Sequence, residues 1–180
     1  MITFDIWLFR AINFFHTPIL NYIAIVLSSV TEYGIFWYVL LLVILCINRK
    51  KNLKIFIFGL ATLAANLGIV RIVNQFWVRQ RPYQALDSVV RLGTMWQNNS
   101  FPSGHVLSCF AVSTYLFFVY PKLGKWLLLM SFAVAWSRVY SGMHYPLDVF
   151  ASFLLGILLG CVVYRIDKWY EQKYGRADNS

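Results

Sequence analysis

The sequence predicts an all-α fold, a polytopic transmembrane bundle of about five core spans with an amphipathic helix at its N-terminus. Hydrophobic residues make up 59% of the 180 positions and charged residues only 13%, which is too apolar for a soluble domain of this length. The apolar residues form long runs, and the 16 Lys and Arg residues lie in short clusters between them. Despite the net charge of +9, this clustering favours orientation in a membrane over a nucleic-acid partner.

The N-terminal region is less apolar than a membrane span. Residues 1–15 have apolar side chains at helical spacing, interrupted by Asp5, Arg10 and Asn13. This pattern predicts an amphipathic helix that lies at the membrane interface. Residues Pro18 to Val30 are more apolar but short for a span, which favours a re-entrant or partial crossing. A full crossing by this segment is the alternative, and it would raise the number of spans to about six.

We expect one domain over residues 1–180, because no linker or repeat divides the chain. Residues 1–31 form the interfacial or re-entrant N-terminal helices, residues 32–166 the transmembrane core, and residues 167–180 a charged cytoplasmic tail. A polar connection from Val78 to Ser100 interrupts the core. The predicted spans centre on Ile35 to Ile47, Ile55 to Trp77, His105 to Tyr120, Trp126 to Trp136 and Leu147 to Val163.

The distribution of cations predicts the orientation of the bundle. In a five-span arrangement ten of the 16 fall on one side, which the positive-inside rule makes cytoplasmic. They are Arg49, Lys50, Lys51, Lys54, Lys122, Lys125, Arg165, Lys168, Lys173 and Arg176. Of the other six, all but Arg10 cluster near the outer face, namely Arg71, Arg79, Arg81, Arg91 and Arg138. An ionisable group at membrane depth needs a partner or a ligand, so these arginines indicate a candidate site on the outer face.

The stretch from Ser137 to Asp148 carries the most informative polar residues. If a helix begins near Tyr145 or Pro146, Asp148 can reach back one turn to His144. A carboxylate on one ring nitrogen fixes the tautomer and leaves the other nitrogen free as a nucleophile or base. The guanidinium of Arg138 offers a planar fork of donors suited to phosphate oxygens. From local spacing alone, a structural Arg138–Asp148 ion pair with His144 capping a helix is an equal alternative.

A second segment, Pro102-Ser103-Gly104-His105, has the composition of a turn that leads into a helix. Free backbone amides and the dipole at a helix start favour an anion. Ser103 adds a hydroxyl donor, and His105 in the first turn can give a proton to a leaving oxygen. Together with Arg81 at the end of the second span, these segments deliver several polar groups to one face, as in a catalytic site.

These residues resemble the three-part motif of the type 2 phosphatidic acid phosphatase superfamily. The first part is Arg81-Pro82 and the second is Pro102-Ser103-Gly104-His105. The third is Ser137-Arg138, followed after five residues by His144 and after three more by Asp148. The second and third parts match completely, and the resemblance extends from about Asn74 to Asp148.

The first part departs from the family pattern. Seven residues before its Arg the family usually has a Lys, and this chain has Asn74. An Asn can donate a neutral hydrogen bond, and Arg79 or Arg71 is an alternative source of the missing cation. Some bacterial undecaprenyl-diphosphate phosphatases in the superfamily also lack the Lys. The stretch Thr31-Glu32-Tyr33-Gly34 is similar to theirs as well.

The resemblance implies a role for each motif residue. His144 would attack phosphorus and form a phosphohistidine, with Asp148 orienting the imidazole. His105 would protonate the leaving oxygen and later activate water. Four further groups would hold the phosphate oxygens, namely Arg81, Arg138, Ser103 and the Gly104 amide, with Asn74 in the position of the Lys. The scheme needs no metal and no other cofactor.

The resemblance also implies a phosphorylated membrane lipid as the substrate. We expect a bacterial plasma-membrane enzyme that converts undecaprenyl diphosphate to undecaprenyl phosphate on the extracytoplasmic side. Phosphatidylglycerophosphate or phosphatidic acid is the alternative substrate, and a transporter or binding protein for phosphorylated lipids is the alternative of another class. The connection from Tyr83 to Asn99 is either an amphipathic lid that admits the lipid or an ordinary interfacial loop. The sequence predicts no particular oligomeric state.

Overall fold

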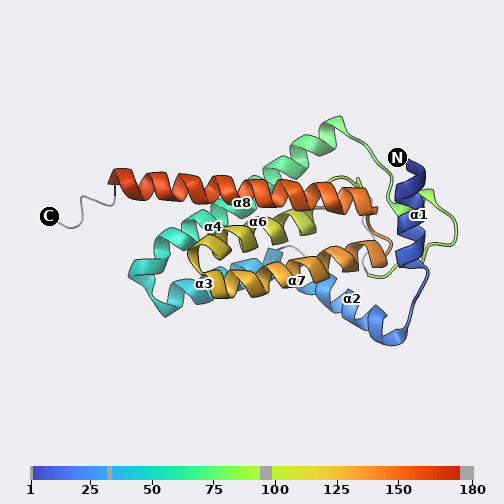
Figure 1. Cartoon of the computed structure of the whole chain (residues 1–180), viewed down its shortest axis with the longest axis horizontal. Helices are drawn as coiled ribbons and strands as arrows, with labels where there is room; N and C mark the ends of the chain where they lie inside the picture. Colours follow the sequence, from blue (N-terminus) through green and yellow to red (C-terminus); the bar gives the residue numbers. More distant parts are fainter. Residues whose placement is uncertain (1, 32–33, 94–98, 175–180) are drawn as a thin grey trace.

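A computed structural model describes residues 2–31, 34–93 and 99–174 of the chain. Within these ranges every regular element is a helix, which confirms the all-α prediction (Figure 1). In chain order the elements are α1 (Ile2–Asn13), α2 (Pro18–Val30), α3 (Ile35–Ile47), α4 (Arg49–Phe76), α5 (Pro82–Ala85), α6 (Gly104–Val119), α7 (Pro121–Tyr140) and α8 (Pro146–Tyr174).

The central helix α6 packs on both α7 and α8, and these are the most extensive helix contacts in the described chain. Two glycines of α8 allow its close approach to α6. A Cβ atom at Gly156 would lie 2.8 Å from the carbonyl oxygen of Leu107, and one at Gly160 would lie 2.6 Å from that of Ala111. Small residues in membrane helices commonly allow such close backbone packing. These contacts hold the first turn of α6 beside the middle of α8, near Gly156.

Helix α1 lies across one end of the bundle (Figure 1). The segments Thr3–Asn13 and Pro18–Val30 are bent by 116° relative to each other. The buried residues of α1 are Asp5, Phe9 and Asn13, which are four apart and share one face. The buried face thus includes Asp5 and Asn13, two of the polar residues that interrupt the apolar spacing, whereas Phe4 and Trp7 are exposed. The buried face contacts α7 and α8.

Among the described residues, two helices, α4 and α8, are long and apolar enough to cross a membrane by length and composition. The bent α1–α2 pair meets the same criterion only when its two helices are taken together. This is fewer than the five spans predicted. Helix α3 has 13 residues, which extend only about 20 Å against a hydrocarbon core of about 30 Å. Helix α7 has 20 residues but includes Lys122, Lys125 and Arg138.

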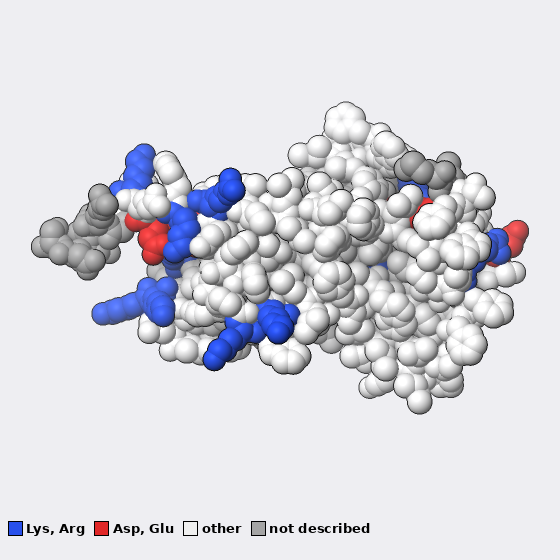
Figure 2. Space-filling model, viewed as in Figure 1, with Lys and Arg blue, Asp and Glu red and all other residues white. Residues whose placement is uncertain are grey.

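Charged side chains gather at the two ends of the molecule and leave a broad band without charge between them (Figure 2). At one end α3 meets α4, α7 begins and α8 ends (Figure 1). Nine of the ten cations assigned to the cytoplasmic side belong to this end, and Arg176 lies outside the described residues. The motif residues lie at the opposite end, beside α1.

The tail predicted to begin at residue 167 starts within helix α8. Helix α8 continues to Tyr174, and residues 175–180 lie outside the described part of the chain. Asp167 is only 2% exposed, because the Lys54 ammonium lies 2.8 Å from its carboxylate. The Tyr115 hydroxyl also donates to Asp167 at 3.3 Å. These contacts hold residue 167 within the bundle.

Candidate active site

A cavity of about 110 Å³ lies where the ends of α4 and α7 meet the start of α6. Its lining comprises Val70, Asn74, Arg81, Asn99, Pro102, Gly104, His105, Arg138 and His144. Six of the eight predicted site residues are in this list. The other two, Ser103 and Asp148, are buried nearby, outside the lining. The fold therefore brings the three motif segments together around one small polar cavity.

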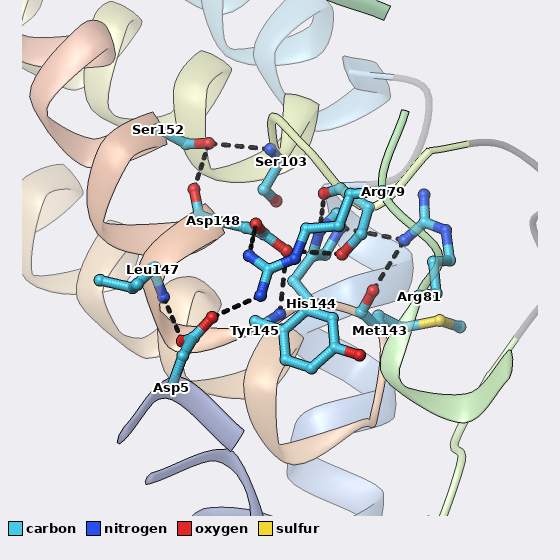
Figure 3. Close-up of polar contacts among 11 residues, drawn as sticks. Asp5, Arg79, Arg81, Ser103, Met143, His144, Tyr145, Leu147, Asp148 and Ser152 are labelled. Carbon is cyan, nitrogen blue, oxygen red and sulfur yellow. Dashed lines mark hydrogen bonds and ion pairs between the residues drawn. The ribbon is translucent and has the colours of Figure 1, made fainter. Parts of the chain in front are cut away.

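His144 lies between α7 and α8 and is 2% exposed. Its Nδ1 atom is 2.6 Å from the carbonyl oxygen of Ser100, and its Nε2 atom is 3.1 Å from Nη1 of Arg81. A carbonyl only accepts and a guanidinium only donates, so the proton belongs on Nδ1 and the lone pair on Nε2. The same Arg81 nitrogen donates to the carbonyl oxygen of Met143 at 2.9 Å (Figure 3). These contacts fix both the tautomer and the orientation of the imidazole.

The backbone around His144 depends on a glycine. Helix α7 ends at Tyr140. Beyond it, the backbone amides of Met143 and His144 both donate to the carbonyl oxygen of Arg138, each at 3.2 Å. The turn contains Gly142 at φ +74°, a conformation that favours glycine. A Cβ atom at this position would also lie 2.8 Å from the carbonyl oxygen of Val90. The turn therefore places His144 directly beside the last turn of α7, which carries Arg138.

The surroundings of His144 keep its imidazole neutral. Burial lowers the pKa of His144 well below its ordinary value of 6.5, and the positive charges of Arg81 and Arg138 lower it further. At neutral pH the ring is therefore unprotonated on Nε2. A neutral imidazole with its lone pair facing a cavity lined by arginine side chains can act as a nucleophile.

Asp148 is fully buried in the first turn of α8. Its Oδ2 accepts from the Ser100 hydroxyl at 2.5 Å and from the Tyr145 amide at 3.1 Å, and its Oδ1 lies 2.5 Å from Nη1 of Arg79. The predicted direct contact between Asp148 and the imidazole of His144 is therefore not formed. Ser100 links the two side chains instead, with its hydroxyl on Asp148 and its carbonyl oxygen on His144. Helix α8 begins only at Pro146, so His144 precedes the first turn and the i, i+4 geometry does not apply. The alternative prediction of an ion pair between Arg138 and Asp148 is also wrong, because the cation that pairs with Asp148 is Arg79.

The Pro-Ser-Gly-His segment begins α6 as the sequence predicts, with Ser103 at the N-cap and Gly104 as the first helical residue. His105 lines the cavity, and its Nε2 atom is buried without a hydrogen-bond partner among the described residues. The Ser103 amide donates to the Ser152 hydroxyl at 2.8 Å, and the Ser103 hydroxyl is buried without a partner within the described chain. Gly104 is among the residues that line the cavity, and Ser103 is not.

Asn74 takes the cavity position at which the family motif has a Lys. Its Oδ1 atom is buried without a partner in the described residues, and its carbonyl oxygen accepts from the Asn99 side chain at 3.1 Å. Arg79, one proposed substitute for the Lys, is occupied by Asp5 and Asp148. The other, Arg71, is exposed. Neither is among the residues that line the cavity.

A second cavity of about 430 Å³ adjoins the first between α3, α4 and α6. The two share Val70, Gly104 and His105. The rest of its lining is Thr31, Gly34, Tyr38, Leu63, Asn66, Leu67 and Ser108, which is mostly apolar. The polar cavity therefore meets an apolar one at His105. Glu32, part of the predicted Thr31-Glu32-Tyr33-Gly34 similarity, lies outside the described residues.

In the described residues of the candidate lid from Tyr83 to Asn99, the one helix is the short Pro82–Ala85. Leu86 and Val89 pack against the buried side chains of Val139 and Tyr145. Residues 94–98, which include Met95 and Trp96, lie outside the described part. The described part of this connection is packed on protein.

Sequence reasoning missed Asp5, Asn99, Ser100 and Ser152. Asn99, Ser100 and Ser152 each form a hydrogen bond with a residue of the motif. Asp5 bonds to Arg79, which in turn contacts the motif residue Asp148. Asp5 alone had a sequence signal, since an acidic residue interrupts an apolar stretch. The hydroxyl and amide side chains have many ordinary uses, so their spacing carried no signal.

Comparison with known proteins finds a family model and relatives that match this chain. The model of the PAP2 superfamily matches residues 54–172. The bacitracin transport permease protein BcrC of Bacillus licheniformis is 32% identical over 140 residues, covering 77% of this chain and 69% of that protein. The undecaprenyl-diphosphatase BcrC of Bacillus subtilis strain 168 is 30% identical over 155 residues, covering 83% and 76%. The crystal structure of Aquifex aeolicus LpxE has a TM-score of 0.74 and 28% identity, covering 89% of this chain and 94% of that one.

Proposed function

The chain belongs to the PAP2 superfamily and is a lipid phosphatase, and from this premise we propose that it hydrolyses undecaprenyl diphosphate through a phosphohistidine on His144. The observation that carries the proposal is the cavity in which a neutral His144 faces Arg81, Arg138 and His105. The substrate follows the name of the Bacillus subtilis relative, which is an undecaprenyl-diphosphatase.

The terminal phosphate would bind in the polar cavity. Arg81 and Arg138 present planar donors, and Gly104 contributes the free amide of a helix start. Asn74 adds a neutral donor in place of the Lys. These groups would surround the equatorial oxygens, on which negative charge accumulates in the transition state.

The reaction would proceed in two displacements. Nε2 of His144 forms a bond to the terminal phosphorus while the bond between phosphorus and the bridging oxygen breaks. His105, which the negative charge of the bound diphosphate would keep protonated, gives its proton to that oxygen, and undecaprenyl phosphate leaves. His105 then takes a proton from water, the water oxygen bonds to phosphorus, and the P–N bond breaks to release inorganic phosphate.

The Ser100 carbonyl has a defined part in this scheme. It holds the Nδ1 proton throughout, so that only Nε2 can react. When phosphorus bonds to Nε2 the imidazole becomes positively charged. The dipole of the Ser100 carbonyl would stabilise that charge. The negative charge of Asp148, which accepts from the Ser100 hydroxyl, would add to the effect.

The second cavity supports a lipid substrate. Ligand pockets are mostly apolar with a few polar groups that fix orientation, and here the apolar part adjoins the polar part at His105. The prenyl chain, which is esterified to the inner phosphate, would pass from the region of His105 between α3, α4 and α6. A soluble phosphate ester would leave this apolar volume unused.

The proposed topology has α3, α4, α6, α7 and α8 crossing the bacterial plasma membrane, with the polar cavity on the extracytoplasmic side. The cations at the opposite end support this orientation by the positive-inside rule. The short helices α3 and α6 contact the longer α4, so protein packing compensates for their length. In this arrangement α2 is a partial crossing packed on α7.

Phosphate release by the purified full chain in detergent, with EDTA present, tests the proposal. The substrates are undecaprenyl diphosphate, phosphatidylglycerophosphate and phosphatidic acid, assayed with the wild type, His144→Ala and the distant control Glu171→Gln. We expect turnover of undecaprenyl diphosphate above the two phospholipids, an unchanged control and a silent His144→Ala. A preferred phospholipid would overturn the substrate, and an active His144→Ala would overturn the nucleophile.

A trapping experiment tests the intermediate directly. Substrate labelled with ³²P on its terminal phosphate is mixed with excess enzyme and quenched with alkali, because a P–N bond to imidazole resists base and is cleaved by acid. Label on the peptide that contains His144 supports the two-step scheme. Turnover of the same sample without label on any peptide would indicate direct attack by water.

A further inference from the structure

Helix α1 lies outside residues 54–172, the range that the family model matches, yet it contributes a buried carboxylate to the site. Asp5 is 1% exposed. Its Oδ1 accepts from the Leu147 amide at 2.9 Å, and its Oδ2 lies 2.5 Å from Nη2 of Arg79 (Figure 3). One side chain of the N-terminal helix thus contacts both the start of α8 and the segment that follows α4.

Arg79 bridges two carboxylates. One terminal nitrogen contacts Asp5 and the other contacts Asp148, each at 2.5 Å. Its guanidinium carbon lies 3.9 Å from the ring centroid of Tyr145, which in turn packs against Phe9 of α1 at 5.7 Å. Both carboxylate side chains are 0% exposed, so either one would be costly to bury without the guanidinium.

The hydrogen bonds continue from Asp148 to the nucleophile. The Ser100 hydroxyl donates to Asp148 at 2.5 Å, and the Ser100 carbonyl accepts from Nδ1 of His144 at 2.6 Å. A continuous series of polar contacts therefore extends from α1 to the ring nitrogen that holds the proton. Its charged part, two carboxylates and one guanidinium, has one net negative charge. That charge favours the cationic imidazole formed during phosphoryl transfer.

We propose that Asp5 is a positioning residue for catalysis, which acts through Arg79 and Asp148 to hold Ser100 against His144. This inference rests on the proposed function, because it takes His144 as the nucleophile. Asp5 does not line the polar cavity, so it has no contact with the phosphate. Its loss should affect the chemical step and leave substrate binding intact.

A purely structural role for Asp5 makes a different prediction. Helix α1 is also held by Asn13, whose side chain donates to the carbonyl oxygens of Tyr140 at 2.7 Å and Val90 at 2.8 Å. If Asp5 only docks α1, then Asn13→Ala and Asp5→Asn should have similar effects. If Asp5 acts through Arg79, then Asp5→Asn should reduce kcat far more than Asn13→Ala.

Steady-state kinetics of the full chain in detergent with undecaprenyl diphosphate tests the proposal. The variants are Asp5→Asn, Asp5→Glu, Arg79→Gln and the double Asp5→Asn/Arg79→Gln, with the exposed Arg10→Gln as the charge-removal control on the same helix. We expect Asp5→Asn to lower kcat by about 10- to 100-fold, the scale of a misplaced catalytic group, with KM unchanged within about twofold. Asp5→Glu should recover part of kcat, and Arg10→Gln should equal the wild type.

The double variant decides whether Asp5 acts through Arg79. Residues that act as one unit have non-additive effects, so the double variant should be no slower than the slower single variant. The proposal would be overturned if the fold-losses of kcat in the two single variants multiplied in the double variant. It would also be overturned by an unchanged kcat in Asp5→Asn, or by a loss of kcat in Asn13→Ala equal to that in Asp5→Asn. Activity in His144→Ala would instead overturn the proposed function, whereas a silent His144→Ala beside a fully active Asp5→Asn refutes only the role of Asp5.

Discussion

The Nδ1 atom of His144 lies 2.6 Å from the backbone carbonyl oxygen of Ser100, and the Ser100 hydroxyl lies 2.5 Å from the Asp148 carboxylate. One residue thus separates the histidine from the aspartate that the motif pairs with it. Ser100 also begins the segment that ends at His105. The backbone that orients the proposed nucleophile therefore belongs to the segment that carries the proposed acid.

Ser100→Ala should separate the two functions of that residue. The substitution keeps the carbonyl and removes the hydroxyl, leaving Oδ2 of Asp148 with the Tyr145 amide. We expect the free energy of unfolding to fall by about 1–3 kcal/mol, the cost of an unsatisfied buried polar group. We also expect kcat to fall without a rise in KM. Chemical denaturation and steady-state kinetics measure the two effects. The matched control for loss of a buried hydroxyl is Ser113→Ala on α6, whose hydroxyl lies 3.0 Å from that of Ser131 and lines neither cavity. An unchanged kcat in Ser100→Ala would mean that the carbonyl orients His144 without Asp148.

The activity should persist into acid conditions in which an ordinary histidine is protonated. The pKa of His144 is lowered by burial and by two cations, so Nε2 keeps its lone pair as the pH falls below 6.5. The groups around the ring are Arg81, Arg138, His105, the Ser100 carbonyl and, behind it, Asp148.

Arg81→Gln should move the acid limb of the pH profile toward neutrality. Removing a positive charge beside His144 raises the pKa of its imidazole, and protonation then abolishes the nucleophile at a higher pH. The measurement is kcat/KM against pH, which reports ionisations of the free enzyme. The control Arg10→Gln, at an exposed position, should leave the acid limb of the kcat/KM profile at the same pH as in the wild type. A shift of the limb to lower pH in Arg81→Gln would contradict the assignment to His144.

Leu67→Trp should discriminate between long and short lipids. Leu67 lines the apolar cavity and is 50% exposed, so a larger side chain can narrow the cavity without disrupting the core. We expect kcat/KM to fall for undecaprenyl diphosphate and to change little for a short-chain prenyl diphosphate. Leu53→Trp, at the other end of α4 and 47% exposed, is the matched control. Equal losses on both substrates would indicate that the prenyl chain does not use this cavity.

Asn74→Lys should restore the cation that the family motif usually has. The side chain lines the polar cavity, and a charged donor there would add one contact to a bound phosphate. We expect the inhibition constant of inorganic phosphate to fall by up to about tenfold, which corresponds to about 1.4 kcal/mol. Gln75→Lys places the same charge on an exposed neighbouring position and should have no effect. An unchanged constant in Asn74→Lys would show that residue 74 does not contact the phosphate.

The sequence by itself determined the helical class and the main polar residues of the site. Apolar runs separated by charged turns define membrane helices locally, and Pro-Ser-Gly-His marks a helix start by its composition. His144, His105, Arg81 and Arg138 were predictable because charged groups at the ends of apolar runs need a common polar environment. The structure brings these four residues together around one cavity.

The tertiary structure decided which atoms meet. Asp148 could accept from any nearby donor, and the packing of α1 and of residues 79–100 against α8 selected Arg79 and Ser100. Asp5 lies 142 residues from Leu147 in the chain, so no local pattern could pair them. The apolar cavity likewise depends on how three helices are spaced. Hydrogen-bond partners and cavities require positions accurate to a fraction of an ångström, and those positions arise only when distant segments pack together.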